Sequence, residues 1–345
     1  AMEAGAAFFE LKARFDAGFS FANAEAALMA YQAELFRFDQ LYRHFHEAAE
    51  KVEPMGWAVL HELRVRIEET YTGWFLPQFG TAWARVVEGE GGLLSHWTAA
   101  GMPNQHRFFD IQVAPLLAAG AKRVFVVISD AFRYEIGEEL QTLMRQEDRF
   151  EADLEPALAM LPSYTQLGMA ALLPNKTLTL VDNDAGMALV DGQSAQGTIN
   201  RGKILGAAVT AGMAIQAEEL MQMGKDESRA LVRDNDVVYV YHNLIDAIGD
   251  KRDSEERVFE AAEDTIEEIV RVVKKLNGAN ANNVIVTSDH GFIYQHRPIE
   301  ESDFSSAQVE GDEILFRDRR FILGHGLKGN HGLRRFTPAQ AFRRI

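Results

Sequence analysis

Short apolar runs of β-forming residues alternate with helical stretches from about Phe108 onward, and this alternation most constrains the fold. The clearest runs are Val124–Ser129, Val237–Tyr241 and Val284–Thr287, each long enough for one buried strand. Parallel strands need a crossover connection, which is usually a helix. The pattern therefore predicts an α/β fold over residues 106–345, with a mostly parallel sheet flanked by helices.

Further elements are expected between these runs. Leu154–Leu161 is a second strand candidate, a helix should follow over Gln166–Leu173, and Leu178–Val181 suits a short strand. Residues 184–203 are rich in Gly, Asn, Gln and Ser, which indicates a loop or lid. We also expect helices over Arg133–Arg145 and over Ser254–Leu276 with Ser254 as its cap, and a β-hairpin on the sheet edge over Ile314–Leu323.

The first 105 residues have a different pattern. Asn23–Lys51 carries apolar residues at three- and four-residue spacings, which is the period of a helix, and Val59–Tyr71 and Thr81–Val87 are similar. No pattern typical of catalysis or metal binding occurs here. We expect residues 1–105 to form a helical module for packing or partner contact, separate from the core of residues 106–345.

Composition limits the classes of function. The absence of cysteine excludes disulfides, thiolate zinc sites and cysteine nucleophiles, and it suits a reducing, cytoplasmic location. No apolar run is long enough to span a membrane. The net charge of −16 argues against broad nonspecific binding to nucleic acid, but Gly311–Ile345 has eight Lys or Arg against three acids. A nucleic-acid or nucleotide phosphodiester therefore stays open as a partner. We expect the chain to be C-terminally truncated, because it stops abruptly at Ile345.

Metal-binding side chains follow two of the predicted strands. Asp130 comes directly after Val124–Ser129, and Asp289 and His290 follow Val284–Thr287. The carboxyl ends of parallel strands meet at one edge of a sheet, where α/β proteins build their sites. Carboxylate oxygens and imidazole nitrogens are common zinc ligands. Asp130 alone would equally suit a helix cap, so the prediction of a metal site depends on the whole group.

A hydroxyl is expected at the same edge. Thr165 ends the segment Pro162-Ser-Tyr-Thr165 and opens a predicted helix, where free backbone N–H groups favour an incoming phosphate. A nearby metal could lower the pKa of the hydroxyl, which is otherwise a poor nucleophile. A simple helix cap is the alternative interpretation of this threonine.

Two further carboxylates follow the strand Val237–Tyr241. Asp246 and Asp250 lie four residues apart, so a helical turn would place both on one face. A bound divalent ion would relieve their repulsion, although an acidic loop that caps the next helix explains them equally well. His242 and Asn243 lie beside them and are candidates for outer contacts to the metal ligands.

This order of residues resembles the alkaline phosphatase superfamily, and within it the PglZ proteins of bacterial BREX phage-defence systems. The superfamily has a strand-end aspartate, a helix-opening Ser or Thr nucleophile, an Asp-x3-His pair and then Asp-His-Gly. The resemblance to PglZ rests on Ile128–Glu135, Tyr239–Asp246 and Thr287–Phe292, and it covers about Phe108 to Gly329.

The resemblance implies roles for individual residues. Thr165 would be the nucleophile, Asp246 and Asp250 would hold one metal, and the other metal would be held by Asp130, Thr165, Asp289 and His290. Asp250 stands where the superfamily usually has a histidine. His331 is a weak match for a later histidine ligand of the superfamily, and His325 is a second candidate. Arg133 could steady a phosphate oxygen, although an ion pair with Glu138 is the simpler interpretation.

These roles imply a metal-dependent phosphoesterase, similar to a phosphodiesterase or nuclease, with Zn²⁺ as the expected ion and Mn²⁺ or Mg²⁺ as alternatives. Thr165 would attack phosphorus and form a phospho-threonine. Two other functions stay open, a metal-binding scaffold with little catalysis and a phosphosugar mutase of the same superfamily. The expected partners are other BREX defence proteins.

Overall fold

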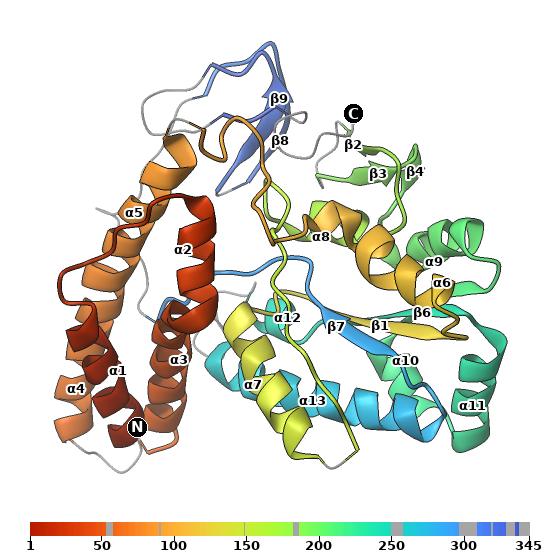
Figure 1. The fold of residues 1–345 in the computed structure, drawn as a ribbon, viewed down its shortest axis with the longest axis horizontal. Helices are drawn as coiled ribbons and strands as arrows, with labels where there is room; N and C mark the ends of the chain where they lie inside the picture. The colour runs from red at the N-terminus through yellow and green to blue at the C-terminus, as the bar shows by residue number, and fades with distance from the viewer. Residues whose placement is uncertain are drawn as a thin grey trace.

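The computed structural model describes residues 1–52, 58–89, 91–147, 149–181, 186–249, 258–296, 309–318, 320–328 and 335–337. A helical part and an α/β part lie side by side (Figure 1). The helical part is built from α-helices joined in two places by π-helical turns. Its elements are α1 (Met2–Arg14), α2 (Ala24–Ala30), η1 (Tyr31–Leu35), α3 (Phe36–Glu50), α4 (Ala58–Thr70), η3 (Tyr71–Phe75) and α5 (Leu76–Glu88).

A parallel sheet in the order β5-β6-β1-β7 forms the centre of the α/β part. β1 (Val124–Ser129) lies between β6 (Val237–His242) and β7 (Val284–Thr287), and β5 (Gly212–Gln216) pairs with the far side of β6. Every residue of β1 and β6 is buried, as expected for strands covered on both faces. The predicted α/β fold with a mostly parallel sheet is confirmed.

Helices cover both faces of this sheet (Figure 1). On one face, apolar side chains of β1 and β6 pack against α8 (Thr165–Ala171) and α9 (Gly197–Ala208). The opposite face packs against the remaining core helices. These are α10 (Ala217–Gln222), α11 (Lys225–Asp234) and α13 (Val258–Gly278), with α7 (Tyr134–Gln146) beside α13. The shorter elements are η4 (Gln105–Arg107), η5 (Phe109–Val113), α6 (Ala114–Ala118) and α12 (Ile245–Gly249).

One expected strand is absent from the structure, and one strand of the main sheet was not expected. Leu154–Leu161 forms no strand, and only Leu158 makes an isolated bridge, to Asn104. Pro156 lacks the N–H that a sheet needs, which explains why this apolar run stays irregular. The fourth strand of the sheet is instead β5, whose short Gly-Met-Ala-Ile-Gln sequence has no strong β signal.

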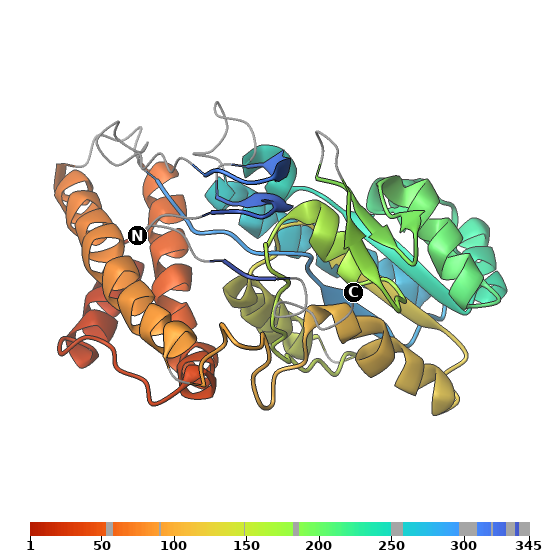
Figure 2. The ribbon, with the colours of Figure 1, turned by 90° about the horizontal axis from the view of Figure 1, so that it is seen from above.

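The remaining corrections concern segments outside the parallel sheet. β2 (Leu178–Leu180) belongs to a separate antiparallel sheet with β3 (Ala188–Val190) and β4 (Gln193–Ser194), so part of the expected loop at 184–203 is ordered structure that runs into α9. The hairpin β8 (Glu313–Arg317) and β9 (Ile322–His325) exists but forms its own two-stranded sheet rather than an edge of the main one. It lies beside the start of α8 (Figures 1 and 2), where Phe321 is 4.9 Å from Tyr164 between ring centroids.

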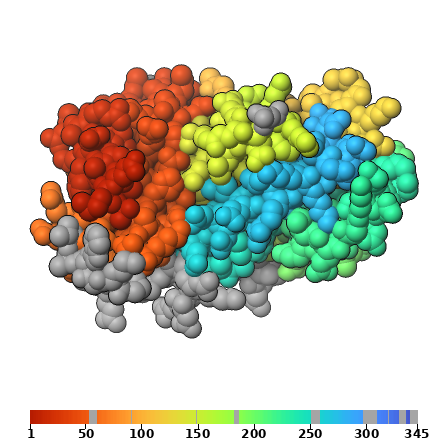
Figure 3. Space-filling model, turned by 90° about the horizontal axis from the view of Figure 1, so that it is seen from below, coloured from red at the N-terminus to blue at the C-terminus, as the bar shows by residue number. Residues whose placement is uncertain are grey.

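The helical part shares a hydrophobic core with the α/β part. Phe38 and Tyr42 of α3 belong to the same buried cluster as Ile136 of α7 and Phe259 of α13. Seen from below, the red and orange N-terminal helices lie directly against α7 and α13 (Figure 3). The boundary at residue 105 stays a prediction, but the two parts are packed together through apolar side chains.

Among the described residues, no helix has both the length and the apolar character that crossing a bilayer requires.

Candidate metal centre

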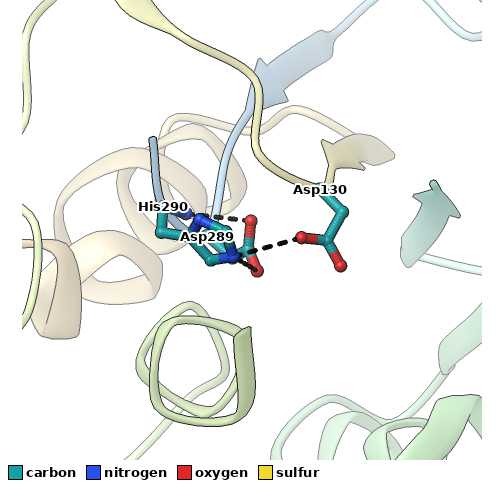
Figure 4. A group of neighbouring side chains, drawn as sticks. All are labelled: Asp130, Asp289 and His290. Atoms are coloured by element: carbon teal, nitrogen blue, oxygen red, sulfur yellow. Dashed lines mark hydrogen bonds and ion pairs between the residues drawn. The ribbon is translucent and has the colours of Figure 1, made fainter. Parts of the chain in front are cut away.

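Asp130, Asp289 and His290 meet at the carboxyl end of the sheet (Figure 4). β1 delivers Asp130, and the neighbouring strand β7 delivers the other two side chains. His290 Nε2 lies 3.4 Å from Asp130 Oδ1 and 3.6 Å from Asp289 Oδ2. All three residues are buried, and one ligand atom from each lies within 4.8 Å of the others. The sequence prediction that these residues lie together therefore agrees with their placement.

Backbone hydrogen bonds fix both aspartates. The Asp130 N–H donates to the His242 carbonyl at 2.9 Å, which ties the end of β1 to the end of β6. Ala131 follows in the left-handed region, with a φ of 59°, and its N–H donates to Asp289 Oδ1 at 3.1 Å. The His290 N–H donates to the same oxygen at 2.8 Å. One oxygen of Asp289 is thus held by the main chain, and the other faces His290.

Two carboxylate oxygens at this site lack a donor. Asp130 Oδ1 and Asp289 Oδ2 are buried and accept no hydrogen bond from any residue that the structure describes. Burial, followed by the negative charges of Asp289 and Asp246, raises the pKa of Asp130 to about 9. Burial also raises the pKa of Asp289 to about 6. Two buried carboxylates are unfavourable unless they share a proton or bind a cation. The donor set therefore fits a divalent metal.

Thr165 joins this group from a different element. It is the first residue of α8, and its Oγ1 lies 3.0 Å from His290 Nε2. Tyr164 is the residue that precedes the helix, and no side chain caps this end. The hydroxyl of Thr165 is therefore directed at the Asp-His group, whereas the alternative interpretation as a helix cap has no hydrogen bond to support it.

Gly168 explains how α8 comes so close to β7. A Cβ atom on Gly168 would lie 2.8 Å from the carbonyl carbon of Asp289 and closer still to its oxygen. Only glycine allows the helix backbone to touch the Asp289 peptide in this way. Because Thr165 lies one turn earlier on the same helix, this contact also sets the position of its hydroxyl.

The second predicted group is described only in part. Asp246 lies in the first turn of α12, and its charge helps to raise the pKa of Asp130, which places it near the site. Asp250 and His331 lie outside the described residues. His325 is exposed and lies 3.8 Å from Glu313 on the hairpin, where it contacts none of the three grouped residues.

His242 and Asn243 have defined local contacts. His242 is buried between Ser129 Oγ, at 3.0 Å from its Nδ1, and Glu268 Oε2, at 2.9 Å from its Nε2. Its side chain supports the strand ends beside Asp130. Asn243 Oδ1 accepts the N–H of Ala247 and so stabilises the first turn of α12.

The expected ion pair between Arg133 and Glu138 was wrong. Its guanidinium pairs with Asp39 of α3 at 2.9 Å and not with Glu138, which instead accepts from Gln40. The side chain is buried, and its guanidinium also donates to the carbonyl of Phe292. Glu138 lies five positions further along the chain, but the shared core places the carboxylate of Asp39 from another helix next to Arg133.

Sequence reasoning missed Gln105. Its side-chain amide donates to the carbonyl of Asp289 at 2.6 Å and to that of Ser288 at 3.0 Å. It comes from the short turn η4, in a region without apolar periodicity, and contacts the site only through backbone atoms. No motif could have indicated it.

A strand-end aspartate, an Asp-His pair on the neighbouring strand and a threonine that opens a helix define an α/β protein of the alkaline-phosphatase-like class. The family described as "BREX system PglZ alkaline phosphatase-like domain" matches residues 108–341. The chain belongs to the PglZ family of BREX systems.

Two relatives extend the similarity beyond this domain. The chain is 40% identical over 319 residues to "Alkaline phosphatase-like protein BrxZ" of Escherichia coli O9:H4 (strain HS), which covers 92% of the chain and 36% of that protein. It is 34% identical over 309 residues to "Alkaline phosphatase-like protein PglZ" of Bacillus cereus (strain H3081.97), which covers 89% of the chain and 35% of that protein. Both alignments are longer than residues 106–345, so the similarity includes N-terminal helices. The chain spans about a third of the length of these relatives.

Proposed function

We propose that this chain carries a metal-dependent phosphoesterase site of a BREX defence system, with Thr165 as the nucleophile and a phosphodiester as the substrate. The observation that carries the proposal is the contact between Thr165 Oγ1 and His290 Nε2 at 3.0 Å, next to two carboxylate oxygens that accept no hydrogen bond from the described residues. A hydroxyl held among buried metal-binding side chains suits phosphoryl transfer better than it suits structural support alone.

The residues of the site have separate roles in this proposal. Asp130, Asp289 and His290 would hold a divalent cation, with zinc favoured by the mixture of nitrogen and oxygen donors. When bound, the cation supplies positive charge that lowers the pKa of a nearby hydroxyl and offsets charge on phosphate oxygens. Asp246 would belong to a second cation site together with Asp250.

Thr165 forms and later loses a covalent bond in this reaction. Its Oγ1 gives up its proton and bonds to phosphorus, the P–O bond to the leaving group breaks, and the departing alkoxide takes up a proton to leave as the alcohol. Water then cleaves the phospho-threonine and restores the hydroxyl. A phosphosugar mutase would instead pass the phosphoryl group to a second hydroxyl, so the products distinguish the two reactions.

The description of the matching family names BREX systems, and we propose other BREX proteins as the partners of this chain. A nucleic-acid phosphodiester is the substrate class that we favour. The side chains of Arg317 and Arg320 are exposed on the hairpin beside the start of α8, and Arg320 Nη2 lies 3.4 Å from the Ser163 carbonyl. Such cations would lie next to the phosphate backbone of a strand that enters the site.

The test is hydrolysis of bis(p-nitrophenyl) phosphate with added Zn²⁺ or Mn²⁺. Thr165→Ala should abolish metal-dependent hydrolysis, whereas Thr165→Ser should retain part of it. Ser163→Ala removes a neighbouring hydroxyl and should change the rate little. Acid quenching during turnover, followed by mass spectrometry, should find a p-nitrophenylphosphoryl group on Thr165. Hydrolysis by Thr165→Ala at the wild-type rate would refute the nucleophile. A wild-type protein that binds metal but hydrolyses nothing would favour the scaffold function.

A further inference from the structure

Gln105 connects two segments that lie far apart in the sequence. Its Nε2 donates to the carbonyls of Asp289 and Ser288, at 2.6 and 3.0 Å, while its Oε1 accepts the N–H of Met160 at 3.1 Å. The side chain is only 5% exposed. Both ends of the amide are therefore used, and each holds main-chain atoms rather than a side chain.

These two segments carry or precede the residues of the candidate site. Asp289 lies directly before His290, and Met160 lies shortly before Thr165. The backbone around Gln105 strengthens the second connection, because the Gln105 N–H donates to the Leu158 carbonyl and the Leu158 N–H donates to the Pro103 carbonyl, both at 2.9 Å. The chain at Gln105 therefore runs beside the approach to α8, and the side chain reaches across to the end of β7.

The Asp289 peptide is held from two directions. Gln105 binds its carbonyl oxygen, and Gly168 of α8 packs against the same carbonyl group. The side chain of Asp289 follows the orientation of this peptide, as does the start of His290. A change of a few tenths of an ångström here would alter the separation between His290 and Thr165.

We propose that Gln105 is a positioning residue that sets the separation between the Thr165 hydroxyl and the Asp289–His290 pair. The inference rests on the proposed function where it concerns metal binding and catalysis. The link that Gln105 makes between the two segments can be tested in the metal-free chain. Gln105 acts through the main chain of the two segments. Outer hydrogen-bond partners of metal ligands typically change affinity by about 10–100-fold when they are lost, and we expect a change of this size.

Two substitutions distinguish the hydrogen bonds that the Gln105 amide donates from the one that it accepts. Gln105→Met has a similar length but loses all three hydrogen bonds. Gln105→Glu keeps an acceptor for Met160 and loses the donors to Ser288 and Asp289. If the link to Asp289 sets the geometry, both variants should weaken metal binding. A wild-type result for Gln105→Glu would assign the role to the Met160 bond alone and would overturn the proposed connection.

Asn175 offers a matched control at the other end of α8. Its Nδ2 donates to the carbonyls of His106, Ala171 and Leu173, at 3.0, 3.3 and 2.7 Å. Asn175→Leu therefore removes a comparable set of amide-to-carbonyl bonds without touching the end of β7. Any general loss of stability should be similar in the control and in the Gln105 variants.

The experiment has two readouts on the same proteins. In metal-free protein, hydrogen–deuterium exchange should rise in residues 157–168 and 286–294 together for both Gln105 variants, and Asn175→Leu should leave residues 286–294 unchanged. In a competition titration with a chelator, the affinity for Zn²⁺ should fall about 10–100-fold for the Gln105 variants only. Gln105→Glu is nearly isosteric and is the second variant to be measured if Gln105→Met does not fold.

The two proposals fail in different ways. If wild-type protein binds no Zn²⁺, the proposed function fails, and the exchange data alone decide whether Gln105 couples the two segments. If wild-type protein binds Zn²⁺ but the Gln105 variants match it in affinity and exchange, the positioning role is refuted while the proposed function stands. Equal increases in exchange for Asn175→Leu at residues 286–294 would also refute a specific role for Gln105.

Discussion

Arg133 Nη2 lies 2.9 Å from Oδ1 of Asp39, so a residue three positions after a candidate metal ligand is paired with the N-terminal helices. The same guanidinium donates to the Phe292 carbonyl at 2.6 Å and lies over the ring of Tyr294 at 4.4 Å. Phe292 follows His290 closely in the sequence. The helical part therefore holds the main chain on both sides of the candidate metal centre.

A second buried pair reinforces this contact. Arg43 Nη2 of α3 lies 3.0 Å from Glu135 Oε2 of α7, and the hydroxyl of Tyr294 donates to the other oxygen of Glu135 at 2.7 Å. Arg43 and Glu135 are both almost completely buried. Breaking one side of such a pair leaves an uncompensated charge in the core. The helices are thus joined to the α/β part by charges as well as by apolar packing.

Asp39→Asn should destabilise the whole chain because it leaves the Arg133 charge without its partner. The expected loss in the free energy of unfolding is about 3–5 kcal/mol, measured by chemical denaturation. Glu147→Gln is the matched control, since its pair with Lys274 is about half exposed at both ends. The control should cost less than about 1 kcal/mol. Equal unfolding midpoints for Asp39→Asn and wild type would contradict the assigned pair.

Asp289→Asn should remove a candidate ligand while preserving the size of the side chain. Because loss of an outer partner already costs about 10–100-fold, the affinity for Zn²⁺ should fall by at least about 100-fold. Asp153→Asn changes an aspartate whose side chain is 90% exposed, and it should leave the affinity unchanged. Titration against a fluorescent chelator measures both. Wild-type affinity in Asp289→Asn would remove this residue from the ligand set.

The benefit of metal to stability should increase with pH. Burial and the neighbouring charges of Asp289 and Asp246 raise the pKa of Asp130 to about 9 in the metal-free fold. Because an unfolded aspartate titrates near pH 4, the contribution of this group to stability is complete below about pH 4 and is lost as the pH rises through about 9. Metal binding requires the deprotonated carboxylates. The metal-induced rise in Tm should therefore be larger at pH 8.5 than at pH 6, and a constant rise would contradict the coupling.

Gly168→Ala should disturb both the fold and the site. The added Cβ overlaps the Asp289 carbonyl, so α8 must move away, at an expected cost of about 1–3 kcal/mol and with weaker Zn²⁺ binding. Gly80→Ala is the matched control, because a Cβ there meets nothing within 4 Å in the middle of α5. Alanine should stabilise that helix by up to about 1 kcal/mol. Thermal unfolding with and without Zn²⁺ distinguishes the two outcomes.

The strands that could be predicted are those whose sequence is a continuous run of β-forming apolar residues. Val124–Ser129 agrees with β1, which is buried at every residue, and Val284–Thr287 agrees with β7, whose residues are half-buried at the edge of the described sheet. β5 could not be found in this way, because its sequence Gly-Met-Ala-Ile-Gln contains no run of β-branched or aromatic residues. Leu154–Leu161, in contrast, has the apolar side chains expected of a strand, but its proline lacks the N–H that pairing in a sheet requires.

The candidate site could also be predicted only in part. Asp130 and Asp289–His290 were predictable because β1 and β7 pair directly and end at one edge. The partner of Arg133 was not predictable, since Asp39 lies on a helix whose position depends on the packing of a separate module. Gln105 could not be predicted either, because its side chain contacts main-chain atoms and it belongs to no local sequence motif.

The contact between Gly168 and the Asp289 peptide has a consequence for related sequences. A threonine followed three positions later by glycine is the sequence pattern of a helix that can approach the Asp-His strand this closely. A relative that keeps the threonine but carries a larger side chain three positions later would need a displaced helix and a wider site. The Thr-x-x-Gly spacing, combined with Asp-His-Gly, is therefore a simple criterion for choosing which members of the family to assay for phosphoesterase activity.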